Sequence, residues 1–168
     1  MATPQFIQDI RAKAGDTLLL LPGVVMVVFD DRGRVLLNRR ADNGKWALIS
    51  GIPDPGEQPA EAAVREIHEE TGVSAVVERV LSVFTNERVV YPNGDHAQYI
   101  DIVLRCRALS GEARVNDDES LEVRWFALDE LPALGPIARG RIELALRDEP
   151  AWFAPATAPG LDDPGFAP

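Results

Sequence analysis

Three segments of the chain repeat apolar residues at helical spacing. The first places Phe6, Ile7 and Ile10 on one face. The second opens with Pro59, which suits a first helical turn, and closes before Gly72, a natural C-terminal stop. The pattern therefore predicts helices over residues 4–14, about 59–71 and about 136–147.

Shorter apolar runs bounded by turn residues are typical of strands. The sequence DDRG at 30–33 predicts a hairpin turn, and YPNGD at 91–95 is a second turn-rich link. A short apolar segment at 46–50 leads into GIPDPGE, whose prolines and glycines predict a shaped loop. Strands are expected over residues 24–29, 34–39, 74–84, 97–107 and 121–126. Strands alternating with helices in this way indicate a mixed sheet covered by helices, an α/β or α+β sandwich.

The 168 residues suit one domain with a sizeable core, and no internal repeat is visible. We expect an N-terminal helical extension at 1–16, a main domain at 17–147 and a C-terminal tail at 148–168. The tail is rich in Ala and Pro and lacks periodicity, so it is expected to be irregular. Contacts of the tail with the domain are expected from its aromatic residues Trp152, Phe153 and Phe166.

Charge and cysteine content narrow the function classes. The chain carries 27 acidic and 17 basic residues, which argues against binding of a nucleic-acid polymer. No apolar run reaches the roughly 18 residues of a membrane span, and the first residues lack the features of a signal peptide. The lone Cys106, expected in the core, excludes an internal disulfide and fits a reducing compartment. We therefore expect a cytoplasmic protein with no membrane partner.

The second predicted helix is unusually acidic for a chain with a net charge of −10. Glu66, Glu69 and Glu70 are spaced i, i+3, i+4, so their carboxylates share one face. Ala63 and Ile67 lie on a neighbouring arc that would dock on the sheet. A solvated acidic face is the ordinary explanation for such a pattern. Carboxylates that converge beside a buried face also suit a hard divalent cation, which prefers oxygen ligands.

The spacing of the residues around these glutamates favours a cation site over a solvated acidic face. Gly51, five residues, Glu57, seven residues and then REIHEETGV at 65–73 resemble, at every defined position, the signature of the Nudix hydrolases, the family of the MutT-like enzymes. Trp46-Ala47-Leu48 and the late strand at 123–126 resemble the family as well. The chain departs from it at Ile49-Ser50, where the family often has Pro-Gly. The resemblance implies the Nudix fold, an α/β/α sandwich with a curved mixed β-sheet.

The same resemblance implies an activity and the residues that carry it. Nudix enzymes use Mg²⁺ or Mn²⁺ and water to cleave a nucleoside diphosphate linked to another group, X. It implies Glu69 and Glu70 as primary metal ligands, helped by the Gly51 carbonyl. Glu66 is implied as a metal ligand, as the catalytic base, or as both. Arg65 is expected to form a supporting ion pair with Glu57, and a direct phosphate contact by Arg65 is the alternative.

In this family a further base or ligand often comes from a later loop. Glu119 is the candidate here, ahead of Asp117 and Asp118 in the same acidic loop. A loop of this composition is equally typical of solvated surface, so the two interpretations stay open.

Substrate contacts are less defined by the sequence. Arg39 and Arg40 precede the loop and could receive phosphate or ribose oxygens, or could simply end a solvated strand. Trp46 could stack on a base or pack under the loop. Three residues of the second turn could shape a base or sugar pocket, although their first role is the turn itself. These three are Tyr91, Asn93 and Asp95.

Several functions remain open at this level. A small nucleotide substrate of the ADP-ribose kind is favoured over a (d)NTP such as an oxidised purine nucleotide. A non-catalytic module that senses a nucleotide is the alternative from another class, and it predicts eroded glutamates, whereas all are present here. The N-terminal helix and the tail are candidate contacts of a homodimer.

Overall fold

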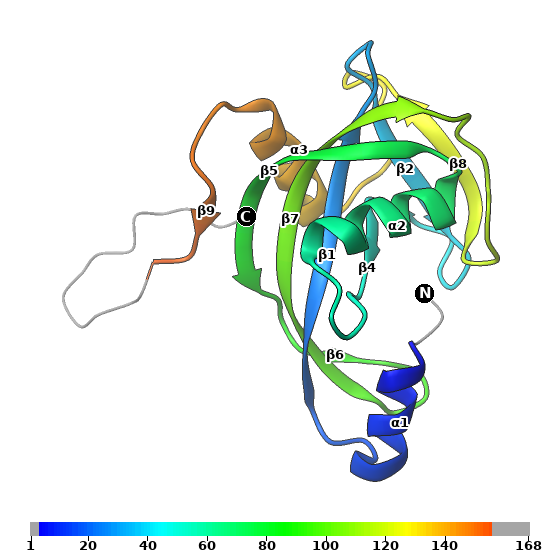
Figure 1. The fold of residues 1–168 in the computed structure, drawn as a ribbon, viewed down its shortest axis with the longest axis vertical. Helices are drawn as coiled ribbons and strands as arrows, with labels where there is room; N and C mark the ends of the chain where they lie inside the picture. The colour runs from blue at the N-terminus through cyan, green and yellow to red at the C-terminus, as the bar shows by residue number, and fades with distance from the viewer. Residues whose placement is uncertain (1–3, 156–168) are drawn as a thin grey trace.

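A computed structural model describes residues 4–155 of the chain, in which nine strands form one mixed sheet with helices on both faces (Figure 1). The three helices are α1 (Gln5–Ala14), α2 (Pro59–Thr71) and α3 (Pro136–Leu146). The first five strands are β1 (Leu19–Phe29), β2 (Val35–Arg40), β3 (Trp46–Ala47), β4 (Ile49–Gly51) and β5 (Ser74–Thr85). The remaining four are β6 (Val89–Val90), β7 (His96–Ser110), β8 (Ser120–Phe126) and β9 (Trp152–Phe153). The predicted α/β sandwich is confirmed.

The sheet is organised around β1 and β7. These two strands run parallel, with Leu19 opposite Ala97 and Phe29 opposite Arg107. The central strand order is β3-β2-β1-β7-β5-β9, and β4, β6 and β8 pair with β1, β7 and β2 respectively. Both β5 with β7 and β2 with β8 are antiparallel pairs. β4 pairs with residues 24–26 in the middle of β1, so the β4–α2 loop begins there.

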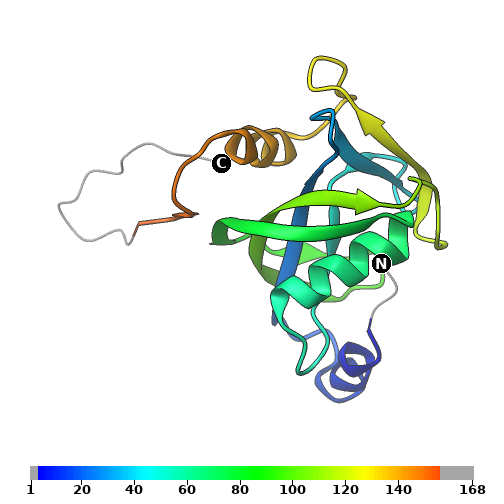
Figure 2. The same cartoon turned by 45° about the horizontal axis from the view of Figure 1, so that its top comes forward.

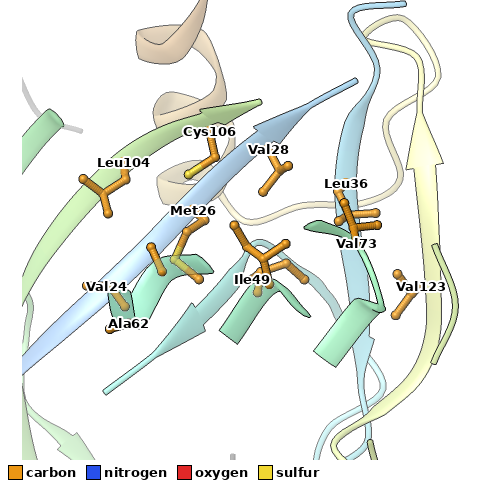
Figure 3. Close-up of a cluster of buried hydrophobic side chains, with 12 residues drawn as sticks. Val24, Met26, Val28, Leu36, Ile49, Ala62, Val73, Leu104, Cys106 and Val123 are labelled. Carbon is orange, nitrogen blue, oxygen red and sulfur yellow. The ribbon is translucent and has the colours of Figure 1, made fainter. Parts of the chain in front are cut away.

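Alternation along β1 creates two cores, one on each face of the sheet. Val24 and Met26 pack with Ile67 of α2, in the cluster drawn in Figure 3. Val25 and Val27 pack with Ile142 of α3 on the other face. Figure 2 shows α2 and α3 on opposite sides of the sheet. This two-sided burial explains why β1 reads as a nearly continuous apolar run in the sequence.

β1 begins five residues earlier than expected, because its pairing with β7 continues through Pro22 and Gly23. Its register with β4 starts only at Val24. The missing N–H of Pro22 therefore falls outside that second ladder, where a proline is tolerated. Gly23 is needed for space, since a Cβ there would lie 2.5 Å from a carboxylate oxygen of Asp101.

The C-terminal tail is less irregular than the sequence predicts. Trp152 and Phe153 form β9, which pairs in parallel with Ser82 and Val83 of β5. Trp152 packs edge-on to Phe84, with ring centroids 6.4 Å apart. Phe153 is instead 70% exposed, so its predicted packing is wrong. Phe166 lies outside the described residues.

α1 docks on its own chain at the end of the sheet beside β6 (Figure 1). Ile7 is buried against Leu21 and Ala97, and the Arg11 guanidinium donates to the His96 carbonyl. No helix within residues 4–155 has the length and apolar character needed to cross a membrane. The expected homodimer stays a prediction.

Candidate active site

The acidic helix α2 begins and ends where its sequence requires. The side chain of Gln58 and that of Glu61 form a capping box, and Pro59 occupies the first turn. The helix stops at Gly72, whose φ of 70° is left-handed. Its buried residues include Ala62, Ala63 and Ile67, which face the sheet. The acidic face is therefore fixed in rotation by the packing of the apolar one.

Gly51, the last residue of β4, lies directly against Glu66 of α2. A Cβ at Gly51 would lie 2.2 Å from both Cδ and Oε1 of Glu66. The Glu66 carboxylate therefore occupies the space that a side chain at position 51 would need, and glycine leaves that space free. The Gly51 backbone and the Glu66 carboxylate thus form one compact oxygen-rich corner.

Arg65 links the loop and the helix through several carboxylates. Its Nε and Nη2 donate to the two carboxylate oxygens of Glu57, both at 2.9 Å. Nη1 donates to Glu66 and to Glu69 at 3.0 Å each. The hydrogen bond from Arg65 holds the pKa of Glu57 below its ordinary value. The expected ion pair between Arg65 and Glu57 is present, and it ties the β4–α2 loop to α2.

Glu70 points into the protein between α2 and β2. It is 4% exposed, and Nδ2 of Asn38 donates to its Oε2 at 2.7 Å. The same Nδ2 is 3.2 Å from Oγ of Ser120, at the start of β8. Asn38 and Ser120 are themselves each 6% exposed. Glu70 is thus held from the sheet, not only by its own helix.

The loop between β7 and β8 is bound to the C-terminal end of α2. Nδ2 of Asn116 donates to the carbonyls of His68 and Glu69, at 3.1 and 3.2 Å. The His68 carbonyl also accepts from the Gly72 N–H, so Asn116 adds a second bond there and donates to the neighbouring Glu69 carbonyl of the last turn. This docking carries Asp117 and Glu119 toward the carboxylates of α2.

The carboxylates of this cluster perturb one another. Burial raises the pKa of Glu66 to about 7, against the attraction of Arg65, and the charges of Glu69 and Glu119 raise it further. Burial raises the pKa of Glu70 to about 8, and the charges of Glu66, Asp117 and Glu119 act in the same direction. Negative charge therefore exceeds the positive charge that Arg65 supplies.

The donor set fits a hard divalent cation, because the Glu66 carboxylate lies against Gly51 and the charges of Glu69 and Glu70 act on it from the same helix. Within residues 4–155 no three His, Cys, Asp or Glu side chains are arranged as a ready-made metal site. Arg65 accounts for part of this arrangement, since it engages Glu66 and Glu69. A cation at this position would compete with Arg65 for those two carboxylates.

Of the predicted basic residues, Arg40 lies on the side of the carboxylates. Its guanidinium is bound by Asp42 at 2.7 and 2.9 Å. The hydrogen bond to Asp42, and further the charge of Glu70, raise the pKa of Arg40. Arg39 lies 4.0 Å from Glu122 on β8, and its Nε is buried without a hydrogen-bond partner in the described chain.

Trp46 packs away from the carboxylates. Its ring meets Phe126 edge-on at 4.8 Å, within the core on the α3 face of the sheet. Trp46 therefore lies on the α3 face of the sheet rather than beside α2.

The predicted pocket residues of the second turn serve local structure. The Tyr91 hydroxyl is 2.7 Å from that of Tyr99. Asn93 and Asp95 bond to each other within the turn, and Asp95 lies 3.6 Å from Arg11. The turn is thus anchored to α1 and to β7.

Three residues at the site were not expected from the sequence: Asn38, Asn116 and Ser120. The sequence gives one weak indication of Asn38, because this polar residue directly follows the apolar residues of the strand VLLNRR. Asn116 and Ser120 lie among other polar residues and carry none.

Known proteins share this architecture. A family model described as the NUDIX domain matches residues 19–147. A MutT-like protein of Streptomyces ambofaciens is 34% identical over 108 residues, which are 64% of this chain and 64% of that protein. An ADP-ribose pyrophosphatase of Methanocaldococcus jannaschii is 34% identical over 122 residues, 70% of this chain and 69% of the relative. The chain thus spans about two thirds of the length of these relatives.

A solved structure extends the likeness to three dimensions. The crystal structure of a UDP-X diphosphatase superposes with a TM-score of 0.60 at 28% sequence identity, covering 86% of this chain and 70% of that one. Residues 19–147, which the NUDIX model matches, contain α2, its glutamates and the strands β1 to β8. The chain therefore belongs to the Nudix hydrolase family.

Proposed function

We propose that the protein is a divalent-metal-dependent pyrophosphohydrolase that cleaves a nucleoside diphosphate linked to another group, with ADP-ribose as the type of substrate. The observation that carries the proposal is the carboxylate cluster at Gly51 and α2. Burial and mutual repulsion raise the pKa of Glu66 and of Glu70 there. A cation relieves both effects, and Nudix hydrolases generally need divalent metal ions.

The residues divide into distinct roles. Glu69 and Glu70 hold Mg²⁺ or Mn²⁺, together with the Gly51 carbonyl. When bound, the ion screens the pyrophosphate charge and makes a water more acidic. Glu66, whose pKa of about 7 suits proton transfer near neutral pH, shares the ion or accepts the proton of the attacking water.

Supporting residues keep this arrangement in place. Arg65 braces the loop through Glu57, and its bonds to several carboxylates favour a supporting role over direct phosphate binding. Glu119 enters from the docked β7–β8 loop as a further ligand or base. Arg40 is the nearest candidate for a phosphate contact, because the charge of Glu70, after the hydrogen bond to Asp42, contributes to its raised pKa.

The class of substrate is supported by two relatives. One is named an ADP-ribose pyrophosphatase and another a UDP-X diphosphatase, and both names describe a nucleoside diphosphate bearing a further group. An oxidised deoxynucleoside triphosphate is the second candidate, consistent with a Bacillus subtilis relative that is named a putative 8-oxo-dGTP diphosphatase.

A nucleotide panel tests the proposal. ADP-ribose, a UDP-sugar and 8-oxo-dGTP are incubated with wild type, Glu69→Gln and Glu61→Gln in Mg²⁺ or Mn²⁺, and the released mononucleotide is quantified. Glu61 is the matched control, because it lies on the same helix and Gln preserves its capping role. We expect AMP from ADP-ribose with wild type and Glu61→Gln, and a loss of roughly 10³-fold with Glu69→Gln.

Two outcomes contradict the proposal. Equal turnover by wild type and Glu69→Gln removes the metal assignment. Absence of cleavage for every nucleotide, with binding retained, leaves the non-catalytic sensing module in its place.

A further inference from the structure

Asn38 occupies a position that the strand pattern assigns to an apolar residue. In β2, Val35 and Leu37 face the α3 core, whereas Leu36 faces the α2 core. Alternation puts Asn38 on the α2 face with Leu36. The side chain is 6% exposed, so a buried amide stands where leucine would continue the core.

The contacts of this amide are one-sided. Its Nδ2 donates to Oε2 of Glu70 at 2.7 Å and lies 3.2 Å from Oγ of Ser120. Its Oδ1 is buried and has no hydrogen-bond partner within residues 4–155. A buried carbonyl oxygen without a partner costs free energy on folding. Stability of the fold therefore does not explain the asparagine.

The hydrogen bond from Asn38 to Glu70 does explain the asparagine, as a support of the Glu70 carboxylate. A glutamate side chain has three rotatable bonds, and α2 fixes only its Cα. The hydrogen bond from Asn38 on β2 to Oε2 gives the carboxylate a second point of attachment, which restricts its orientation. Ser120 directly follows Glu119, so the same amide also contacts the base of the loop that supplies Glu119.

We infer that Asn38 is a positioning residue for the metal ligand Glu70, an inference that rests on the proposed function. It acts through Glu70 and does not touch substrate. Outer hydrogen bonds of this kind orient metal ligands, and their loss typically weakens metal affinity by roughly 10- to 100-fold. Ser120 assists by holding the second N–H of Asn38.

A matched pair of variants tests this role. Asn38→Leu removes the donor and keeps the volume. Asn86→Leu is the control, because Nδ2 of Asn86 also donates to a carboxylate at 2.7 Å, that of Asp101, away from α2. Mn²⁺ affinity is measured by electron paramagnetic resonance, and activity is measured as a function of Mg²⁺ concentration. Asn38→Ser provides a second variant that loses the same contact, should Asn38→Leu fail to fold.

We expect Asn38→Leu to weaken Mn²⁺ binding about tenfold and to raise the Mg²⁺ concentration for half-maximal activity by the same factor. The kcat at saturating Mg²⁺ and the KM for substrate stay within about twofold of wild type. Recovery by added metal marks positioning when circular dichroism shows that the variant is folded without metal, because metal binding also stabilises a partly unfolded variant. Asn86→Leu binds Mn²⁺ as wild type does.

Two results separate failure of this inference from failure of the proposed function. If Glu69→Gln weakens Mn²⁺ binding but neither Asn38 variant does, the positioning role is wrong and the metal site stands. If Glu69→Gln also leaves Mn²⁺ binding unchanged, the metal assignment itself fails, and the role of Asn38 fails with it.

Discussion

Two buried carboxylates in this protein have similar surroundings and opposite electrostatics. Glu70 and Asp101 are 4% and 6% exposed, and each accepts a 2.7 Å hydrogen bond from an asparagine. Asp101 also accepts a 2.6 Å bond from Arg141 of α3. The charges that raise the pKa of Glu70 come instead from other carboxylates. One cluster is neutralised within the chain, whereas the other retains excess negative charge.

The difference separates a structural ion pair from a binding site. The Arg141 side chain is 12% exposed, and its guanidinium carbon lies 5.0 Å from the centroid of the Phe84 ring. That pair joins α3 to β7, and each of its two charges is balanced by the other. The cluster at α2 has carboxylates from a helix and a loop, with Arg65 shared among several of them. A buried charge that the chain does not balance requires a proton or a cation.

The largest expected effect follows from neutralising the acidic cluster. Glu70→Gln removes a ligand charge while keeping the side-chain volume, so kcat/KM for the substrate found in the nucleotide panel is expected to fall by roughly 10³-fold. Steady-state kinetics in Mg²⁺ measure it. A loss of less than about fivefold contradicts the assignment of Glu70.

The same cluster predicts how stability depends on pH. The folded pKa of Glu70, about 8, exceeds its ordinary value of 4.5, so between these values the folded protein binds more protons than the unfolded chain. The free energy of unfolding of the metal-free protein therefore decreases as pH rises from about 4.5 to about 8, with on the order of 4 kcal/mol from Glu70.

Urea denaturation in EDTA, at several pH values, checks this dependence. Glu70→Gln is expected to lose the part of the decrease that comes from Glu70 and to keep the part from Glu66, whose folded pKa of about 7 also exceeds 4.5. Added Mg²⁺ is expected to offset the decrease in wild type. An identical pH dependence for wild type and Glu70→Gln contradicts the excess charge at α2.

The neutralised cluster predicts a loss of stability without a loss of chemistry. Arg141→Met leaves Asp101 buried beside Asn86 without its cation, which is expected to lower the free energy of unfolding by about 3 kcal/mol. Urea denaturation measures this change, and kcat of the folded fraction is expected to stay within about twofold. A tenfold loss of kcat shows instead that Arg141 belongs to the active site.

The smallest effect is expected at the edge of the acidic cluster. Glu119 raises the pKa of both Glu66 and Glu70 through its charge, and its loop is held by Asn116. Glu119→Gln is expected to lower kcat/KM about tenfold, measured beside Asp118→Asn as the control in the same loop. Equal activities of the two variants assign Glu119 to solvated surface.

Much of this arrangement was predictable from local patterns. α2 begins at Pro59 and ends before Gly72 as the sequence predicts, because its caps lie within the segment itself. The spacing of Gly51 and the glutamates identified the acidic face for the same reason. Long-range pairing was harder: β1 extends back to Leu19, because β7, far along the chain, supplies the partner.

The remaining site residues depend on contacts that a linear pattern does not encode. Asn38 meets Glu70 across 32 positions and Ser120 across 82, so neither contact appears in a local window. A lone tryptophan gives no sign of which sheet face it takes, and Trp46 lies on the α3 face. β9 escaped prediction because two residues are too short to show a strand period.

Mn²⁺ titration followed by electron paramagnetic resonance tests the central claim most directly, namely that the excess charge at α2 is a cation site. Wild type and Arg141→Met are expected to bind Mn²⁺ with the same affinity, and Glu70→Gln is expected to bind it at least about tenfold more weakly. Equal binding by wild type and Glu70→Gln, or no binding by wild type at millimolar Mn²⁺, contradicts the claim.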